Sequence, residues 1–123
     1  MNIKTRQAIT EAMFDEVREV SASKGKAYSG TEDVLSNFKR GGHLIDTSKY
    51  QAWAIYAMKH LDTVMGAIRN DPIRPVDNTE GLHGRIKDII TYMILLECLL
   101  YEDNLLAESM PDSMKEKILT KME

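Results

Sequence analysis

The segment EGLHGRIKD, residues 80–88, carries two carboxylates, one imidazole and two cationic side chains within nine positions. In a continuous helix, Glu80 and Asp88 lie on broadly the same side, but a rise of ~1.5 Å per residue separates them by ~12 Å along the axis. At that separation they do not chelate one ion unaided. A magnesium site takes one or two carboxylates with phosphate oxygens and water, so either acid contributes with help from another helix or from a substrate.

Other roles for these residues stay open. Glu80 could complement a helix N-terminus, and Asp88 could pair with Lys87 or Arg85 on a solvated face. The Glu-x-x-His spacing of Glu80 and His83 is used by di-iron bundles, but such sites need two copies and the chain has one. Elsewhere, Glu16 and Glu19 suit a hard cation and are equally typical of a solvated helix.

Nucleophilic catalysis is disfavoured. His43 and His60 have no partner at a metal or triad spacing, so each is expected at the surface or the edge of the core. Cys98 in LLECLLY is expected to be a small buried apolar residue and therefore a poor nucleophile. The glycines of FKRGG are not followed by the Lys-Ser/Thr of a phosphate-binding loop.

Composition narrows the class of protein. The chain has 123 residues, 43% of them hydrophobic and 28% charged, which is typical of a single globular domain over residues 1–123. Its formal net charge of -3 gives no reason to expect general nucleic-acid binding, although Lys39 and Arg40 could bind individual phosphates. With one cysteine, no secretory h-region and no ~20-residue apolar span, we expect a cytoplasmic protein without a membrane segment.

The elements that must position these side chains are all helical. Apolar residues spaced four, four and three apart predict a first helix that runs to about Ser23: Ile9, Met13, Val17 and Val20. Glycines and serines then interrupt the pattern, and Thr31 is a candidate N-cap for a short second helix that ends near Gly41 and Gly42.

Two long helices follow. Asp46, Thr47 or Ser48 caps the first of them, whose stripe is Ala54, Met58, Leu61, Met65 and Ile68. Asp71, Pro72 and Pro75 end it, and Asn78 or Thr79 caps the next. That next helix has an unbroken seam at spacings of four and three: Leu82, Ile86, Ile89, Met93, Leu96 and Leu100.

From Ile89 onward this helix is apolar on nearly every face, so we expect it at the core of the bundle and at a homo-oligomer interface. A short terminal helix is predicted from Pro111 and Asp112 through Ile118 and Leu119. No strand-like alternation occurs, and the predicted fold class is an all-α helical bundle of four to five helices.

Four short motifs together resemble a known family. They are K-x-x-x-Y from Lys24 to Tyr28, the pair Asn37 and Phe38, a lysine late in a long helix at Lys59, and E-x-x-x-G-R-I-x-D-x-x-x-Y from Glu80 to Tyr92. Across residues 20–101 the chain resembles the nucleotide modification associated domain 1 family of phage and bacterial proteins. That family is similar to the all-α MazG-like nucleotide pyrophosphohydrolases.

The resemblance implies an oligomeric all-α protein that holds a nucleoside triphosphate and uses magnesium to hydrolyse its α-β phosphate link. It implies that Glu80 and Asp88 are catalytic and metal-side acids, that Lys59 contacts phosphate, and that Asn37 with Tyr28 or Phe38 contacts the base or sugar. The full set of nucleotide-binding candidates is Lys24, Tyr28, Asn37, Phe38, Lys39, Arg40, Lys59, His83, Arg85 and Tyr92.

One departure from the family pattern leaves the activity open. A third acid is often found midway between the other two, and Gly84 stands at that position. Candidates to replace it are His83, Asp77, Glu32, Glu16 and Glu19. Without it, the alternatives are a non-catalytic phage protein that sequesters a nucleotide signal of host defence, and a purely structural helical oligomer.

Overall fold

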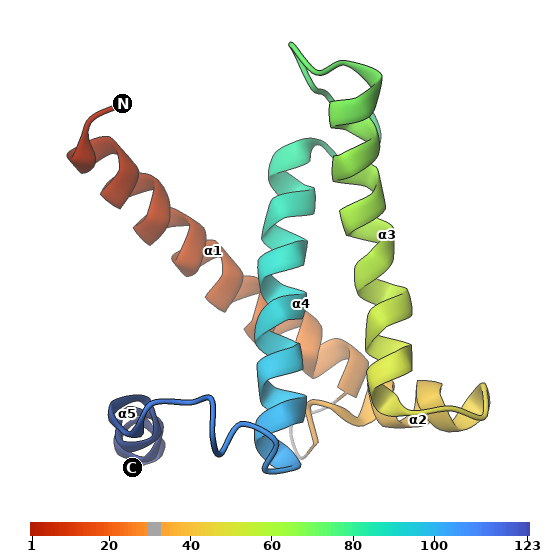
Figure 1. Cartoon of the computed structure of the whole chain (residues 1–123), viewed down its shortest axis with the longest axis vertical. Helices are drawn as coiled ribbons and strands as arrows, with labels where there is room; N and C mark the ends of the chain where they lie inside the picture. The colour runs from red at the N-terminus through yellow and green to blue at the C-terminus, as the bar shows by residue number, and fades with distance from the viewer. Residues whose placement is uncertain (30–32) are drawn as a thin grey trace.

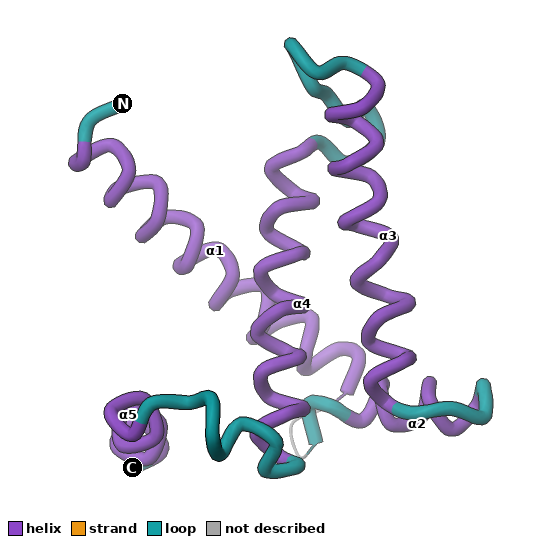
Figure 2. The backbone as a smooth tube through the Cα atoms, in the orientation of Figure 1, coloured by secondary structure: helices purple, strands orange, loops and turns teal. Residues whose placement is uncertain are grey.

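The computed structural model describes residues 1–29 and 33–123, and the side chains outside residues 24–32. In this part of the chain there are five helices and no strand: α1 (Ile3–Ser29), α2 (Ser36–Leu44), α3 (Lys49–Asn70), α4 (Leu82–Glu102) and α5 (Asp112–Met122) (Figure 2). The predicted all-α class is confirmed. No helix of the described part combines the length and apolar character needed to cross a lipid bilayer.

The body of the molecule is the antiparallel pair α3 and α4 (Figure 1). α2 packs on α3 near the base of the pair, and α1 passes behind α4, packing on it and also on α2. The N-terminal half of α1 projects beyond this body, while α5 packs on no other helix of the described part. The helices therefore form an open arrangement with long exposed faces.

The apolar core lies where α2 meets α3 and α4. It consists of Leu35, Phe38 and Leu99, with Tyr50, Trp53, Tyr92 and Leu95 packed around them. Phe38 is 1% exposed, and its ring meets those of Tyr56 and Tyr92 edge-on at 6.1 and 6.4 Å between centroids. The indole Nε1 of Trp53 donates to the carbonyl oxygen of Tyr92 at 2.6 Å, which fixes α3 against the middle of α4.

A polar network closes the same end of the molecule. Lys39 of α2 lies 2.9 Å from both Asp33 and Glu102, and Lys49 of α3 lies 2.8 Å from Asp103. The hydroxyl of Tyr50 donates to Asp103 at 2.7 Å. Burial, together with this bond to a carboxylate, raises the pKa of Tyr50 to about 12. These contacts hold α2 and α3 to the C-terminal end of α4.

Some helix boundaries agree with those predicted from local sequence signals, and others do not. Ser48 is the N-cap of α3, as predicted, and its hydroxyl accepts from the amide of Gln51 at 3.1 Å. The first helix does not end near Ser23 but continues to Ser29. The predicted cap Thr31 lies outside the described residues.

Two glycine positions explain further differences. α2 continues past Gly41 and Gly42 to Leu44, so these glycines do not end the helix. A Cβ atom at Gly42 would lie 2.5 Å from the carbonyl carbon of Ser48, so glycine is required there by the close approach of α2 to the start of α3. α4 is capped by Gly81, at φ 88°, and not by Asn78 or Thr79. The left-handed conformation at Gly81 turns the chain sharply into the helix.

Alanine substitutions at two glycines are expected to change the free energy of unfolding in opposite directions. Gly42→Ala is expected to lower the free energy of unfolding by ~1–3 kcal/mol, because the added methyl meets backbone. Gly84→Ala is the matched control inside α4, where nothing lies within 4 Å of the added atom, and it should raise stability by ~0.5–1 kcal/mol. Urea denaturation measures both. A Gly42→Ala chain as stable as the wild type would contradict the packing of α2 on the α3 N-terminus.

Candidate functional site

Two polar residues are buried where α3 and α4 face each other, above the apolar core. His60 of α3 is 5% exposed and Arg85 of α4 is 9% exposed. The guanidinium Nη1 of Arg85 lies 3.1 Å from the imidazole Nδ1 of His60. A buried charge is tolerated only when it is paired and hydrogen-bonded, so the remaining partners of Arg85 define the site.

The loop that precedes α4 supplies those partners. The guanidinium of Arg85 donates through Nε to Asp77 at 3.2 Å and through Nη2 to the hydroxyl oxygen of Thr79 at 3.1 Å. Its Nη1 also lies 3.1 Å from a carboxylate oxygen of Glu80. Hydrogen bonds from the hydroxyl and amide of Thr79, supported by Arg85, hold the pKa of Asp77 well below its usual range. Asp77 is therefore a fixed anion that anchors Arg85.

Three potential metal ligands converge beside this guanidinium. One ligand atom from each of His60, Glu80 and Asp88 can be chosen so that all three lie within 4.8 Å of one another. The Nδ1 atom of His60 is 3.7 Å from a carboxylate oxygen of Asp88. The expected ~12 Å separation of Glu80 and Asp88 was wrong for the carboxylates, because Glu80 precedes α4 and its side chain returns past the turn at Gly81.

The electrostatics favour a neutral imidazole at the centre of this cluster. Burial lowers the pKa of His60, Asp88 opposes that shift, and the nearby cations Lys59 and Arg85 reinforce it. A neutral imidazole has one ring nitrogen that can accept, either from a guanidinium or from a metal ion. The ring also lies 5.4 Å from that of Tyr92, which links the cluster to the core.

His60, Glu80 and Asp88 can hold a divalent cation only if Nη1 of Arg85 moves away from Glu80 and His60. Nη1 of Arg85 contacts both Glu80 and His60, so the guanidinium lies beside the same ligand atoms that an ion would use. Asp77 and Thr79 hold the other two nitrogens, so only the Nη1 contacts need to be exchanged. The two carboxylates suit Mg²⁺ or Mn²⁺, and the imidazole nitrogen favours a transition-metal ion such as Mn²⁺ over Mg²⁺, with water completing the coordination.

The other residues proposed to fill the gap at Gly84 are not members of the His60, Glu80 and Asp88 group. His83 pairs with Glu16 of α1 at 2.7 Å, and this contact ties α1 to α4. Glu80 therefore meets His60 and not His83, contrary to the Glu-x-x-His pairing. Glu32 lies outside the described residues. Asp77, the remaining candidate near the loop, holds Arg85.

The predicted nucleotide-binding residues are divided among several environments. Phe38 is a core residue, and Lys39 is paired with Asp33 and Glu102 at the base of the molecule. Arg40 donates to the hydroxyl of Ser36 at 3.2 Å, while Lys59 is exposed and follows Met58 on α3 next to His60. The side chains of Lys24 and Tyr28 lie outside the described ones, and Asn37 is half-buried on α2.

Of the predicted nucleotide-binding residues, Arg85 and Tyr92 lie near Glu80 and Asp88. His60 lies with them, although the sequence did not predict a role for it in the site. The residues that surround His60 in this cluster are 20 or more positions away in the sequence, so no local spacing identifies it.

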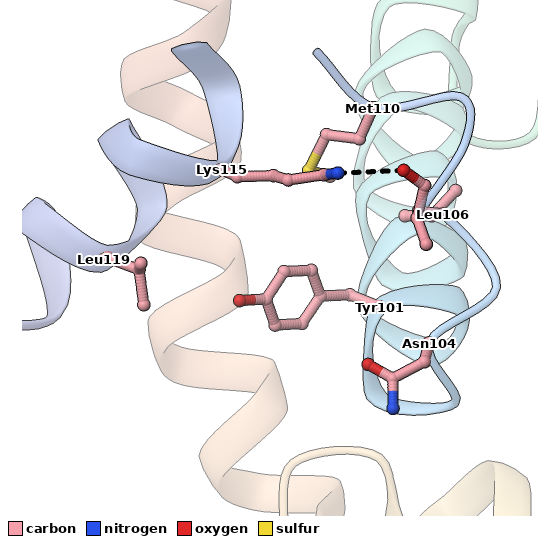
Figure 3. A pocket seen from close by; sticks show the side chains of 7 residues that line it. Tyr101, Asn104, Leu106, Met110, Lys115 and Leu119 are labelled. Atoms are coloured by element: carbon pink, nitrogen blue, oxygen red, sulfur yellow. Dashed lines mark hydrogen bonds between the residues drawn. The ribbon is translucent and has the colours of Figure 1, made fainter. Parts of the chain in front are cut away.

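A separate hollow of about 330 Å³ lies between the C-terminal end of α4, the following loop and α5 (Figure 3). Leu106, Met110 and Leu119 give it an apolar lining, and Nζ of Lys115 donates to the carbonyl oxygen of Ala107 at 2.8 Å. It is at the opposite end of α4 from Glu80 and carries no carboxylate in its lining, so it is not part of the candidate site.

Comparison of the chain with known protein families, with curated proteins and with solved structures finds no match. The function must therefore be argued from the geometry of the cluster.

The buried imidazole predicts a pH dependence of stability. Because its pKa is lowered by folding, the folded chain binds this proton more weakly than the unfolded chain, whose histidine titrates near ~6.5. The free energy of unfolding should therefore fall as the pH drops below ~6.5 and through the lower folded value. His60→Gln should remove that part of the slope, whereas His43→Gln, at an exposed position, should retain it. Urea denaturation between these pH values decides, and equal slopes in wild type and His60→Gln would contradict the burial of a neutral imidazole.

Proposed function

We propose that this chain is a divalent-cation-dependent nucleotide hydrolase of MazG-like type, which releases pyrophosphate from a nucleoside triphosphate. The observation that carries the proposal is the convergence of His60, Glu80 and Asp88 within 4.8 Å beside a buried guanidinium. Phosphoryl chemistry needs ligands for a cation and a separate positive group for phosphate oxygens, and this cluster offers both in one place.

Each residue has a distinct role in the proposed site. Glu80, Asp88 and neutral His60 would hold the ion, which when bound polarises phosphoryl oxygens and lowers the pKa of a bound water. Arg85, anchored by Asp77, turns its Nη1 end from Glu80 to a phosphate oxygen, so that the guanidinium stays paired throughout. Lys59, exposed and next to His60 in the sequence, adds a second positive charge near the cluster.

The base or sugar would lie toward α2, where Asn37 is half-buried. Phe38 supports this side only through packing, since a 1% exposed ring offers no free face for stacking.

A non-catalytic nucleotide binder is the second candidate, favoured by Gly84. This residue lies one turn before Asp88 on α4, and nothing is within 4 Å of the position that a Cβ atom would take. No carboxylate of the described residues fills that space, which would leave a bound ion with fewer anionic ligands than a hydrolase of this kind would use. Such a protein would sequester a nucleotide, for example a signal of host defence if the chain is phage-encoded, without turning it over.

Pyrophosphate release from a panel of nucleoside triphosphates, with Mg²⁺ or Mn²⁺, tests the proposal. Asp88→Asn should lower turnover by ~10² or more, because it removes a charged ligand at the reacting phosphate. Asp62→Asn on the exposed side of α3 is the matched control and should retain activity. Full turnover by Asp88→Asn, or turnover that persists in excess chelator, would remove the cluster from the mechanism.

The same incubation separates the two candidates. Intact nucleotide recovered from a tight complex after denaturation would favour the binder and exclude the hydrolase. In that case Gly84→Glu, which supplies a third acid in open space, is the variant expected to gain turnover.

A further inference from the structure

The hollow beside α5 begins at the turn that ends α4. The amide of Asn104 donates to the carbonyl oxygen of Tyr101 at 3.1 Å, and the amide of Leu105 donates to that of Leu100 at 2.9 Å. These are the two bonds of a Schellman motif, and Asn104 has the left-handed backbone that the motif requires, at φ 58°. The turn therefore directs the chain away from the axis of α4 and toward α5 (Figure 1).

The loop between α4 and α5 supplies an apolar wall of the hollow. Met110 is 7% exposed and Leu106 is half-buried, whereas the residues between them are exposed. The amide of Met110 donates to the carbonyl oxygen of Leu106 at 2.9 Å, and both residues line the hollow. The loop thus turns its two least exposed side chains toward the space that α4 and α5 enclose.

α5 supplies the opposite wall. Lys115 and Leu119 are four positions apart, so they lie on one face of the helix, and both line the hollow. Lys115 holds α5 to the loop through its bond to Ala107, while α5 packs on no other helix of the described part. The ring of Tyr101 points from α4 toward α5 (Figure 3). A molecule in the hollow would therefore contact both helices.

The lining has the chemistry of a site for a small anion with an apolar body. It contains one cation, Lys115, and no carboxylate. An ammonium group has three donors, of which the bond to Ala107 uses one. Asp112 lies 3.6 Å from the same nitrogen, but its side chain is 96% exposed, and such a surface pair contributes little and is easily exchanged. The remaining lining is mainly aliphatic and aromatic, so it favours a ligand with a single charge.

We propose that this hollow binds an apolar monocarboxylate of about the size of octanoate. The carboxylate accepts a hydrogen bond from Nζ of Lys115, and the chain packs against Tyr101, Met110 and Leu119. The volume of about 330 Å³ is at the lower end of the ~300–1,000 Å³ of small-molecule sites. A single ammonium group matches one carboxylate better than a phosphate dianion, which needs more donors. The site does not rest on the proposed function, because it shares no residue with the metal-capable cluster.

Titration of the full chain with octanoate, followed by NMR of the methionine methyl groups, tests the proposal. The Met110 signal, identified by its loss in Met110→Leu, should shift and saturate with a Kd on the order of 1 mM. The Met65 signal, from α3, should not move. Each methylene added from hexanoate to octanoate should tighten binding by ~3–4-fold, because it removes further apolar surface from water. Octanol, which lacks the charge, should bind ~10-fold more weakly than octanoate.

Variants of α5 separate the charge from the apolar contact. Lys115→Met keeps an apolar stem and removes the ammonium group, so it should weaken octanoate binding by ~10-fold and leave octanol binding unchanged. Lys117→Met is the matched control, because Lys117 is exposed on α5 and does not line this hollow. It should bind both compounds as the wild type does.

Four results would overturn the proposal. They are a Met110 signal that octanoate does not shift, a Met65 signal that moves equally, wild-type octanoate affinity in Lys115→Met, and octanol binding as tight as octanoate binding. If Lys115→Met binds neither compound because α5 is released from Ala107, Lys115→Arg decides. It restores the charge and a donor and should bind octanoate within ~3-fold of the wild type. Loss of octanoate binding in Lys115→Arg would equally overturn the proposal.

Discussion

The candidate site and the loop before α4 depend on the burial of one guanidinium between α3 and α4. Arg85 points from α4 toward α3, where it is only 9% exposed, and an unpaired charge that is buried in this way costs several kcal/mol. Each of its three nitrogens is therefore paired: Nε with Asp77, Nη2 with Thr79, and Nη1 with Glu80 and His60. These bonds position the loop before α4. The loop contains two prolines and buries little apolar surface, so packing alone does not fix it.

The same requirement gives the site its chemical character. Atoms arranged to stabilise a buried cation are also arranged to bind a metal ion, because both need carboxylate oxygens and a neutral imidazole nitrogen at short range. The core around Phe38 and the ion pairs of Lys39 and Lys49 hold the N-terminal end of α3 against the C-terminal end of α4. The His60, Glu80 and Asp88 cluster lies toward the other end of this helix pair.

The helices could be predicted because their signals are local: apolar spacing for α3 and α4, and Ser48 as a cap. The predicted seam of α4, however, does not mark the side that packs on α3: its members Ile86 and Met93 are 42% and 49% exposed. The residues of α4 that bond to α3 are Arg85, Tyr92 and Leu99. The site was predicted only in part. His60 depends on partners distant in sequence, and the approach of Glu80 to Asp88 depends on the backbone of Gly81, which no spacing of side chains encodes.

Manganese binding measured by electron paramagnetic resonance tests the central claim most directly, because it reports the ion without requiring a nucleotide. If Arg85 occupies a position that a divalent cation can share, wild type should bind one Mn²⁺ and Arg85→Gln should bind it on the order of tenfold more tightly, the factor that ~1.4 kcal/mol represents. Asp88→Asn should lose the site, and Arg69→Gln, at an exposed position on α3, should match wild type. Equal Mn²⁺ affinity in wild type, Arg85→Gln and Asp88→Asn would contradict the claim.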